Sequence, residues 1–277
     1  MTDSNQELLR GFEQGPIRPP SEAFSLLLRV TRNCPWNRCQ FCPVYKAEKF
    51  SRRAPEEVIA DIDAMRVWYD ELKARSWKLG FGGDLSQEIL QRIYQDDPNN
   101  PALYSLLLFQ LGGAKTVFLQ DADSLIIKTD DLVKVLRHLR EKFPQVERVT
   151  SYARTRTVAK KSLEELKLIR EAGLDRLHIG MESGSDQVLN LMKKGATQAE
   201  EIEAGKKAKE AGFELSEYVM PGLGGKRFSQ DHALQTAEAL NQINPDFIRL
   251  RTLAIPPRAP LYELWKAGQF EMLDDIA

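Results

Sequence analysis

The sequence predicts an α/β fold: an open, partial (β/α)6 barrel of the TIM-like kind, with parallel strands. Six short apolar segments alternate with segments of helical periodicity, and helices of this length suit crossovers between parallel strands. No internal repeat or linker divides the chain, so the six units are expected to form one domain. With 277 residues, 42% of them hydrophobic and 29% charged, the chain has enough apolar material for one large core.

The expected strands are short runs rich in apolar and β-branched residues. In chain order they span residues 24–30, 116–120, 146–152, 176–181, 213–220 and 247–253.

The first expected helix begins at Pro55, which suits a first helical turn and is followed by apolar residues at helical spacing. The later helices are expected at residues 101–111, 130–143, 163–172, 197–211 and 232–243, and Thr197 is the expected N-cap of its helix.

The expected domain organisation is a polar, proline-punctuated lead-in (1–22) followed by the core domain (23–277). Residues 76–114 are long for a connection, and within them the glycines and the run at 96–100 indicate that residues 76–100 are a loop-rich insertion. A substrate lid, an oligomer contact and a passive insertion remain open for it. No apolar stretch approaches the ~20 residues that span a bilayer, and the N-terminus does not resemble a secretory signal. We therefore expect no membrane partner and a cytoplasmic location.

Charge gives little reason to expect a nucleic-acid partner. The net charge is −1 and the isoelectric point is near 6.4, so no global basic field exists. Basic clusters at 46–53, 160–161 and 193–194 are interpreted as solvated faces.

Three cysteines, Cys34, Cys39 and Cys42, fall within nine residues, directly after the first expected strand. An odd, clustered set is poor disulfide material and good metal-ligand material. A [4Fe–4S] cluster usually takes four thiolates, so three would leave one iron open to a substrate or cofactor. A structural zinc site and a chance grouping stay as alternatives, although zinc normally takes four ligands and the three histidines lie far from the cysteines in sequence.

The motif Cys-x4-Cys-x2-Cys, with an aromatic residue before the last cysteine, resembles the radical S-adenosylmethionine (radical SAM) superfamily. The common spacing in that superfamily is one residue shorter in the first gap. The resemblance implies that Cys34, Cys39 and Cys42 ligate three irons of a [4Fe–4S] cluster, while S-adenosylmethionine chelates the fourth. It also implies that Phe41 packs beside the adenine, with simple core packing as the alternative.

The segment after the second strand occupies the place of the superfamily's GGE-type motif, which holds the amino group of the cofactor. The motif is not literal here: Asp123 stands at the glutamate position and Asp121 at a glycine position. With Gln120 before them, they are assigned to the cofactor site, because acidic or carbonyl oxygens suit an amino group. Capping of the next helix is the alternative for the aspartates.

Further resemblances follow the later strands. Glu182 lies in a segment like the superfamily's IGxESG and is assigned to ribose hydroxyls, with a structural carboxylate as its alternative. Ser151 and Arg154 follow the third strand and are assigned to the ribose or to the methionine carboxylate, and a surface ion pair is the alternative for Arg154. The glycine-rich 220–225 segment resembles one that lies under the adenine, and Ile255 is an expected adenine contact.

The sixth strand sends alternate residues to opposite faces, so Arg249 and Arg251 share a face, and Arg251 is expected to point toward a substrate.

The function implied by the resemblance is reductive cleavage of S-adenosylmethionine to a 5′-deoxyadenosyl radical, which removes hydrogen from a small organic substrate. An electron donor such as flavodoxin or ferredoxin would reduce the cluster. The chain looks closest to an elongator-like, uncharacterised branch. Two alternatives remain: a zinc- or iron–sulfur-stabilised scaffold without catalysis, and a radical enzyme acting on RNA or a peptide. The sequence identifies no catalytic residue beyond these, no specific substrate and no oligomeric state.

Overall fold

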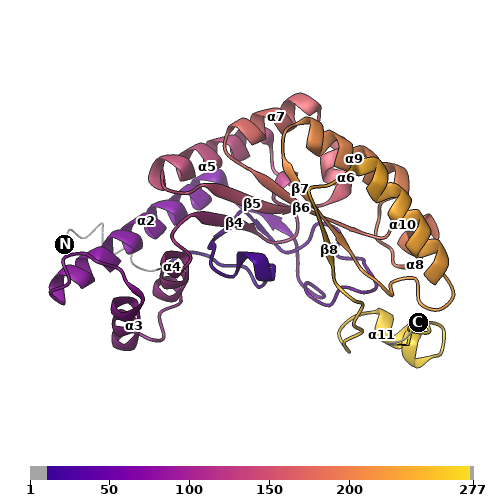
Figure 1. Cartoon of the computed structure of the whole chain (residues 1–277), viewed down its shortest axis with the longest axis horizontal. Helices are drawn as coiled ribbons and strands as arrows, with labels where there is room; N and C mark the ends of the chain where they lie inside the picture. Colours follow the sequence, from indigo (N-terminus) through magenta and orange to yellow (C-terminus); the bar gives the residue numbers. More distant parts are fainter. Residues whose placement is uncertain (1–10, 275–277) are drawn as a thin grey trace.

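The computed structural model describes residues 11–274, and its centre is a six-stranded parallel sheet (Figure 1). The strand order β1-β4-β5-β6-β7-β8 follows the chain, and every neighbouring pair is parallel. The strands are β1 (Leu26–Arg29), β4 (Thr116–Gln120), β5 (Arg148–Ala153), β6 (Arg176–Glu182), β7 (Glu214–Val219) and β8 (Phe247–Leu250). All six expected strands are therefore confirmed, with shorter bounds at half of their ends.

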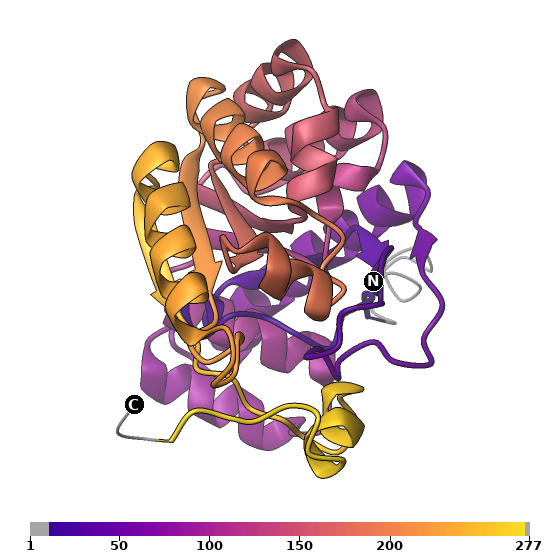
Figure 2. The same ribbon diagram turned by 90° about the vertical axis from the view of Figure 1, so that its right-hand side faces the viewer.

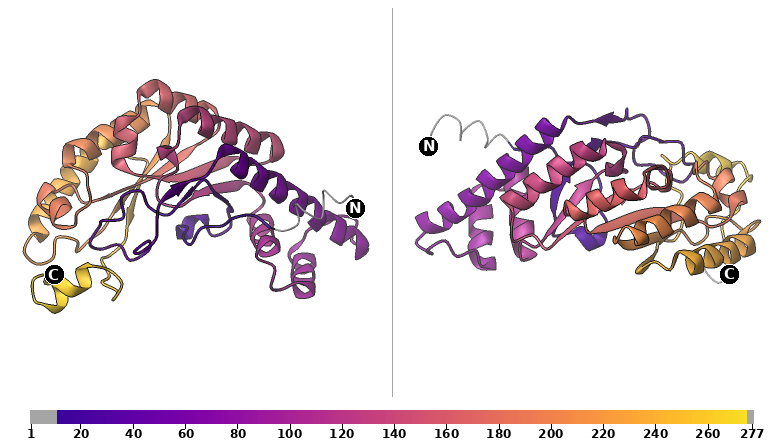
Figure 3. Two further views of the ribbon diagram at one scale, coloured as in Figure 1. Left: turned by 180° about the vertical axis from the view of Figure 1, so that it is seen from behind. Right: turned by 90° about the horizontal axis from the view of Figure 1, so that it is seen from above.

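Helices cover one face of the sheet, here called the helix face; the other, the loop face, carries loops and short helical turns (Figures 1 and 3). The covering helices are α2 (Pro55–Lys78), α5 (Thr129–Lys142), α7 (Leu163–Glu171), α9 (Gln198–Glu210) and α10 (Ser229–Ile243). Fully buried strand residues such as Val117, Leu177 and Leu215 pack with these helices into one core. Burial of this kind explains why the strands are apolar runs. The open, partial (β/α)6 barrel is confirmed.

Local signals in the sequence set several helix ends. Pro55 is the first residue of α2, and the Glu57 carboxylate accepts the Ala54 N–H at 3.0 Å. The Thr197 hydroxyl accepts the Glu200 N–H at 3.3 Å, and the Glu200 carboxylate accepts the Thr197 N–H at 3.0 Å. This reciprocal pair confirms Thr197 as the N-cap of α9.

The long connection before β4 is more helical than expected. After α2 come α3 (Gln87–Asp96) and α4 (Pro101–Leu111), so the expectation of a loop-rich segment is wrong for residues 87–96. Leu103, Leu106 and Phe109 of α4 are fully buried in the main core, and α4 contacts α2 and β1. The segment thus covers the β1 end of the sheet. A lid or oligomer role for it stays a prediction.

Several short elements were not foreseen. They are the antiparallel pair β2 (Thr31–Arg32) and β3 (Ser51–Arg52), the turns η1 (Pro20–Glu22) and η2 (Ser124–Ile126), and the helices α6 (Thr155–Lys160), α8 (Asp186–Leu191) and α11 (Leu261–Lys266). No helix within residues 11–274 is long and apolar enough to cross a membrane.

The described part of the lead-in, from residue 11 onward, packs against the barrel. The Gly15 N–H donates to Gln120 Oε1 at 2.8 Å, and Glu22, the last residue of η1, has no exposed surface. One Glu22 oxygen lies 3.6 Å from the Arg148 guanidinium and 3.8 Å from His178 Nε2. The lead-in therefore closes part of the loop face. Residues 1–10 of the expected lead-in and the last three residues of the expected core domain lie outside the described residues.

Candidate cofactor and metal site

The three cysteines lie in one loop, residues 33–50, which we call the cysteine loop. The pairing of β2 with β3 closes its two ends, and the loop follows β1 at the carboxyl end of the sheet. Cys34, Cys39 and Cys42 are all half-buried free thiols. Ligands of barrels of this type collect at this end of the strands, so the thiols stand where a catalytic site is expected.

Two distant segments hold the middle of the loop. The Gln40 N–H donates to Met192 O after α8 at 2.9 Å, and the Leu261 N–H of α11 donates to Gln40 O at 2.8 Å. Figure 2 shows this C-terminal segment beside the loop. The Trp36 indole N–H donates to Lys193 O at 2.7 Å, and a Cβ on Gly195 would lie 2.5 Å from the Trp36 ring. Gly195 is required for this close approach.

Asp121 fixes the start of the loop to the end of β4. Its carboxylate is fully buried and accepts from Arg29 Nε at 2.7 Å, from the Asn33 N–H at 2.9 Å and from the Tyr45 hydroxyl at 3.0 Å. Asp121 itself has a φ of +68°, a left-handed conformation that side-chain-bearing residues adopt rarely. Such strain persists where surrounding contacts hold it, as these three donors do.

Burial raises the pKa of Cys39 and Cys42. At Cys39 the nearby Lys194 ammonium lowers the pKa, whereas the charges of Cys42 and Cys34 raise it further. The three thiols are therefore close enough to interact electrostatically. Metal coordination requires thiolates, and a cation close to the sulfur stabilises them. The three thiols of the cysteine loop thus lie close to one another and to the positive charge of Lys194.

Lys194 corrects the interpretation of residues 193–194 as a solvated face. Only Lys193 is exposed; Lys194 is 7% exposed and lies among three acids, Glu182, Glu201 and Glu217. Although burial acts against its charge, Glu182 and, less strongly, Glu201 raise the pKa of Lys194. Lys194 is therefore a buried cation beside the cysteine loop.

Two acids of this group were missed from the sequence. Burial raises the pKa of Glu201 to about 8 and that of Glu217 well above its usual range. Glu201 accepts from the Thr155 hydroxyl at 2.5 Å, whereas neither Glu217 oxygen has a hydrogen-bond partner within the described chain. For Glu217 the available signal was a glutamate within an expected buried strand; Glu201 lies in a helix and had no such signal.

Gln120 and Ser151 are engaged elsewhere. Gln120 Nε2 donates to Gly15 O at 3.0 Å and to Ile17 O at 3.2 Å, so its amide binds the lead-in. Ser151 pairs in register with Leu119 and Leu177, on the helix face, and its hydroxyl donates to Tyr152 O at 2.8 Å. Their predicted cofactor contacts stay predictions, and the observed contacts are structural.

Asp123 and Arg154 lie together at the start of α6. The Asp123 carboxylate is fully buried and accepts from the Arg154 N–H at 3.3 Å and the Thr157 hydroxyl at 2.5 Å. It therefore satisfies the N-terminus of α6, as the capping alternative suggested, though on a different helix. The Arg154 guanidinium lies 5.3 Å from the Trp36 ring centre and donates to Lys194 O at 3.2 Å. Arg154 thus faces the cysteine loop rather than forming a surface ion pair.

Phe41 and Ile255 pack against the same small apolar cluster, which includes Leu223 and Leu253. Core packing of Phe41 is therefore observed, and an adenine contact for either residue stays a prediction. Glu182 ends β6 with a φ of +66° and its carbonyl accepts the Met220 N–H at 3.0 Å. The structure thus brings the glycine-rich 220–225 segment beside Glu182.

The family model described as the radical SAM superfamily matches residues 91–237, more than half of the chain. The chain belongs to the radical SAM superfamily. It is accordingly an enzyme of the type that uses a [4Fe–4S] cluster and S-adenosylmethionine. The match begins after the cysteine loop, so the ligand roles of the three cysteines rest on the sequence motif and the geometry above.

Curated relatives support the elongator-like branch of this superfamily. The chain is 27% identical over 111 residues to a tRNA uridine(34) acetyltransferase of Methanocaldococcus infernus, covering 40% of this chain and 21% of that protein. It is 24% identical over 160 residues to the heme chaperone HemW of Bacillus subtilis, covering 57% of this chain and 41% of that protein. The chain thus spans at most about two fifths of these relatives.

Solved structures agree on the fold. The radical S-adenosylmethionine methyltransferase TsrM of Kitasatospora setae superposes with a TM-score of 0.58 at 14% identity, covering 97% of this chain and 42% of that chain. Coproporphyrinogen III oxidase (HemN) of Escherichia coli gives 0.54 at 15% identity, covering all of this chain and 52% of that one.

The residues of the cysteine loop fit the superfamily's iron–sulfur cluster as donors: three free thiols share one loop beside a buried cation. Within residues 11–274, no three Cys, His, Asp or Glu side chains converge as one metal ion would require. The superfamily match gives the zinc alternative no support.

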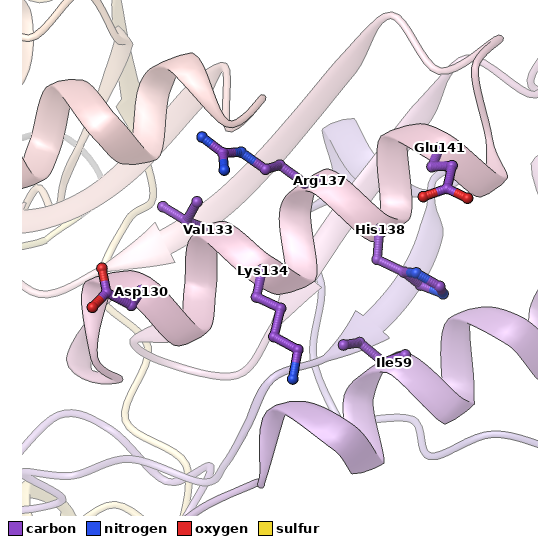
Figure 4. Close-up of a pocket in the computed structure, with 7 residues that line it drawn as sticks. All are labelled: Ile59, Asp130, Val133, Lys134, Arg137, His138 and Glu141. Atoms are coloured by element: carbon purple, nitrogen blue, oxygen red, sulfur yellow. The ribbon is translucent and has the colours of Figure 1, made fainter.

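A groove between α2 and α5 lies on the helix side of this radical SAM domain, and no residue of the cysteine loop lines it (Figures 1 and 4). Charged side chains dominate its lining, and two of the lining residues are paired: His138 Nε2 lies 2.9 Å from Asp63, and Lys134 lies 2.7 Å from Glu56. We assign no function to this groove.

Proposed function

We propose that this chain holds its cluster on Cys34, Cys39 and Cys42 and cleaves S-adenosylmethionine reductively to abstract hydrogen from a small organic substrate. The observation that carries the proposal is the cysteine loop: three free thiols at the carboxyl end of β1, on a loop held by β4, the end of α8 and α11. A low-potential donor such as flavodoxin or ferredoxin is the proposed reductant.

The cluster and S-adenosylmethionine supply the radical chemistry, and the protein's part is to position them and exclude water. Asp121 and Trp36 fix the two sides of the cysteine loop. Lys194 provides a buried positive charge near Cys39, which favours the ionised form of the thiol that binds iron. Glu182 and Arg154 stand close enough to Lys194 to form the polar wall that the cofactor's amino acid and ribose groups require.

The test is anaerobic reconstitution with iron and sulfide, followed by dithionite reduction with S-adenosylmethionine and an assay for 5′-deoxyadenosine. Wild type is expected to hold about four irons per chain and to form 5′-deoxyadenosine. The triple variant Cys34→Ala, Cys39→Ala, Cys42→Ala is expected to lose both. Lys49→Ala, a change at an exposed side chain of the same loop, is the matched control and is expected to retain both.

Zinc in place of iron, with no 5′-deoxyadenosine, contradicts the proposal and favours a scaffold. Iron and 5′-deoxyadenosine at wild-type levels in the triple variant would show that other residues hold the cluster.

A further inference from the structure

A set of aromatic residues lies on the loop face of the sheet, and neither the cluster nor the cofactor assignments use it. Tyr152 of β5 pairs in register with His178 of β6, and Tyr218 of β7 follows on the same face. The His178 ring centre lies 5.8 Å from that of Tyr152 and 5.6 Å from that of Tyr218, and Phe118 lies 5.1 Å from Tyr152. Tyr152 and Tyr218 are half-buried, so they form an accessible aromatic floor.

His178 shows that this floor is polar as well as aromatic. It is fully buried, and neither ring nitrogen has a hydrogen-bond partner within the described residues. The nearest carboxylate oxygen, on Glu22, is 3.8 Å away. The Glu22 carboxylate is thus the charged neighbour of this imidazole, and His178 adds a buried polar ring to the floor beside the two tyrosines.

Two arginines stand beside the floor. Arg249 pairs in register with Tyr218, and Arg251 follows two residues later, so both side chains leave the strand on the loop face. Arg249 Nε donates to the buried Ser216 hydroxyl at 3.0 Å, which leaves its terminal nitrogens available. The Arg251 N–H donates to Val219 O at 3.0 Å, which fixes that backbone at the carboxyl end of β7.

Neither arginine is paired with a carboxylate of the described chain, unlike Arg29 and Arg53. Within residues 11–274 neither Arg249 nor Arg251 forms an ion pair, whereas Arg29 and Arg53, on the other side of the barrel, lie 2.7 Å and 2.6 Å from aspartate oxygens. Arg251 is near enough to Glu182 for its charge to oppose the burial that raises the pKa of that acid, although Lys194 opposes it more strongly. The Arg251 guanidinium therefore lies near both the two tyrosines and Glu182, whereas the Arg249 guanidinium lies beside the floor, 5.8 Å from the Phe247 ring centre.

We propose that Arg249 and Arg251, with Tyr152 and Tyr218, form the substrate subsite, and that the substrate is an aromatic or otherwise planar oxyanion. A guanidinium pairs bidentately with carboxylate and phosphate oxygens, and flat apolar groups stack on tyrosine rings. The carboxylate or phosphate binds the arginines, and the planar part lies on the tyrosines. This inference rests on the proposed function, because it takes the carboxyl end of the strands as the place of the reaction.

The test is a binding measurement on cluster-loaded protein, which does not require cofactor cleavage. The probes are benzoate, phenyl phosphate, inorganic phosphate and uncharged benzyl alcohol, titrated by ligand-observed NMR. Benzoate or phenyl phosphate is expected to bind, and benzyl alcohol at least about tenfold more weakly, since a hydrogen bond to a charged group is worth that much. Benzoate and phenyl phosphate distinguish the two oxyanions, and inorganic phosphate measures the part of binding that needs no ring.

The variants are Arg249→Gln, Arg251→Gln and Arg251→Lys, with Arg227→Gln as the matched control, because Arg227 is exposed and lies beside Phe228, away from the floor. Each glutamine variant is expected to lower the affinity for the oxyanion about tenfold or more. Arg251→Lys is expected to lower it by less, because lysine keeps the charge and loses only the planar fork. Arg227→Gln is expected to bind as wild type does. Thermal unfolding of each variant shows whether a loss reflects misfolding.

Three results would overturn the inference. One is absence of oxyanion binding to wild type, or binding that the glutamine variants leave unchanged. A second is an equal loss of S-adenosylmethionine affinity in the same variants, which would assign the arginines to the cofactor. The third is an RNA oligonucleotide that binds far more tightly than the small probes through these arginines. Failure of wild type to form 5′-deoxyadenosine, with intact oxyanion binding, would contradict the proposed function and leave the anion site standing.

Discussion

Replacement of Asp121 by asparagine tests whether this carboxylate organises the cysteine loop or binds the cofactor directly. The side chain keeps its size and loses its charge, and an amide NH2 then faces at least one of three donors: Arg29 Nε, the Asn33 N–H or the Tyr45 hydroxyl. The Tyr45 hydroxyl can rotate to accept, but the other two cannot. The change therefore breaks one buried charge pair and removes the negative charge from the oxygen that Arg29 Nε and the Asn33 N–H share.

The magnitude follows from these contacts. Breaking a buried ion pair costs about 3–5 kcal/mol when the remaining charge has no partner. Arg29 keeps a second carboxylate, Glu13 at 2.9 Å, so we expect Asp121→Asn to lower the free energy of unfolding by about 2–4 kcal/mol. Tyr45→Phe, which removes one neutral donor, is expected to cost about 1 kcal/mol.

The assays are urea unfolding of each variant and the rate at which a chelator removes iron from the reconstituted protein. Asp121→Asn is expected to release iron faster than wild type, because Asn33 directly precedes the first cysteine. Asp84→Asn, at an exposed aspartate, is the control for the charge change. Wild-type stability and iron retention in Asp121→Asn would refute the anchoring argument. If the affinity for S-adenosylmethionine fell at the same time, the direct cofactor role predicted from the sequence would be supported instead.

Two further predictions concern the walls of the site. Burial raises the pKa of Asp123 to about 6, above its ordinary value of 3.8, so the folded state binds this proton more tightly than the unfolded chain. The resulting stabilisation is complete below pH 3.8 and is lost as the pH rises through about 6. Between pH 4 and 7 the free energy of unfolding of wild type should therefore fall by on the order of 3 kcal/mol relative to that of Asp123→Asn. Parallel pH curves for the two proteins would contradict this. Gly195→Ala should lower the free energy of unfolding by about 1–3 kcal/mol more than Gly80→Ala does. Both glycines have a positive φ, but only a Cβ at Gly195 meets Trp36. Equal losses in urea unfolding would show that the indole moves freely.

The fold was predictable because its pattern is local. Parallel strands that are buried under helices are continuous apolar runs, and Pro55 and Thr197 mark helix starts through their own backbone chemistry. Helix α3 was missed because the loop-like run at 96–100 follows it directly. Its buried residues, Ile89, Leu90 and Ile93, do follow helical spacing, and that signal was present in the sequence.

The site was predictable only where the sequence itself gathers the groups. The three cysteines are neighbours along the chain, and a single loop suffices to bring them together. The charges around them come from separate elements, and no local pattern tells a buried Lys194 from an exposed Lys193. Asp121 shows the same limit. Its acidic character was predicted to serve the cofactor, whereas the fold supplies donors from Arg29 of β1 and from Asn33 and Tyr45 of the cysteine loop.

The acids beside Lys194 explain why this part of the site depends on the whole fold. Glu182, Glu201 and Glu217 come from β6, α9 and β7, and one buried ammonium balances at most one of three negative charges. The ionised form of a buried carboxylate is unfavourable without a partner, so the unbalanced acids retain protons, as the raised pKa values of Glu201 and Glu217 indicate. Because these elements must pack before the acids surround Lys194, the positive charge near Cys39 is a property of the folded barrel and not of the cysteine motif.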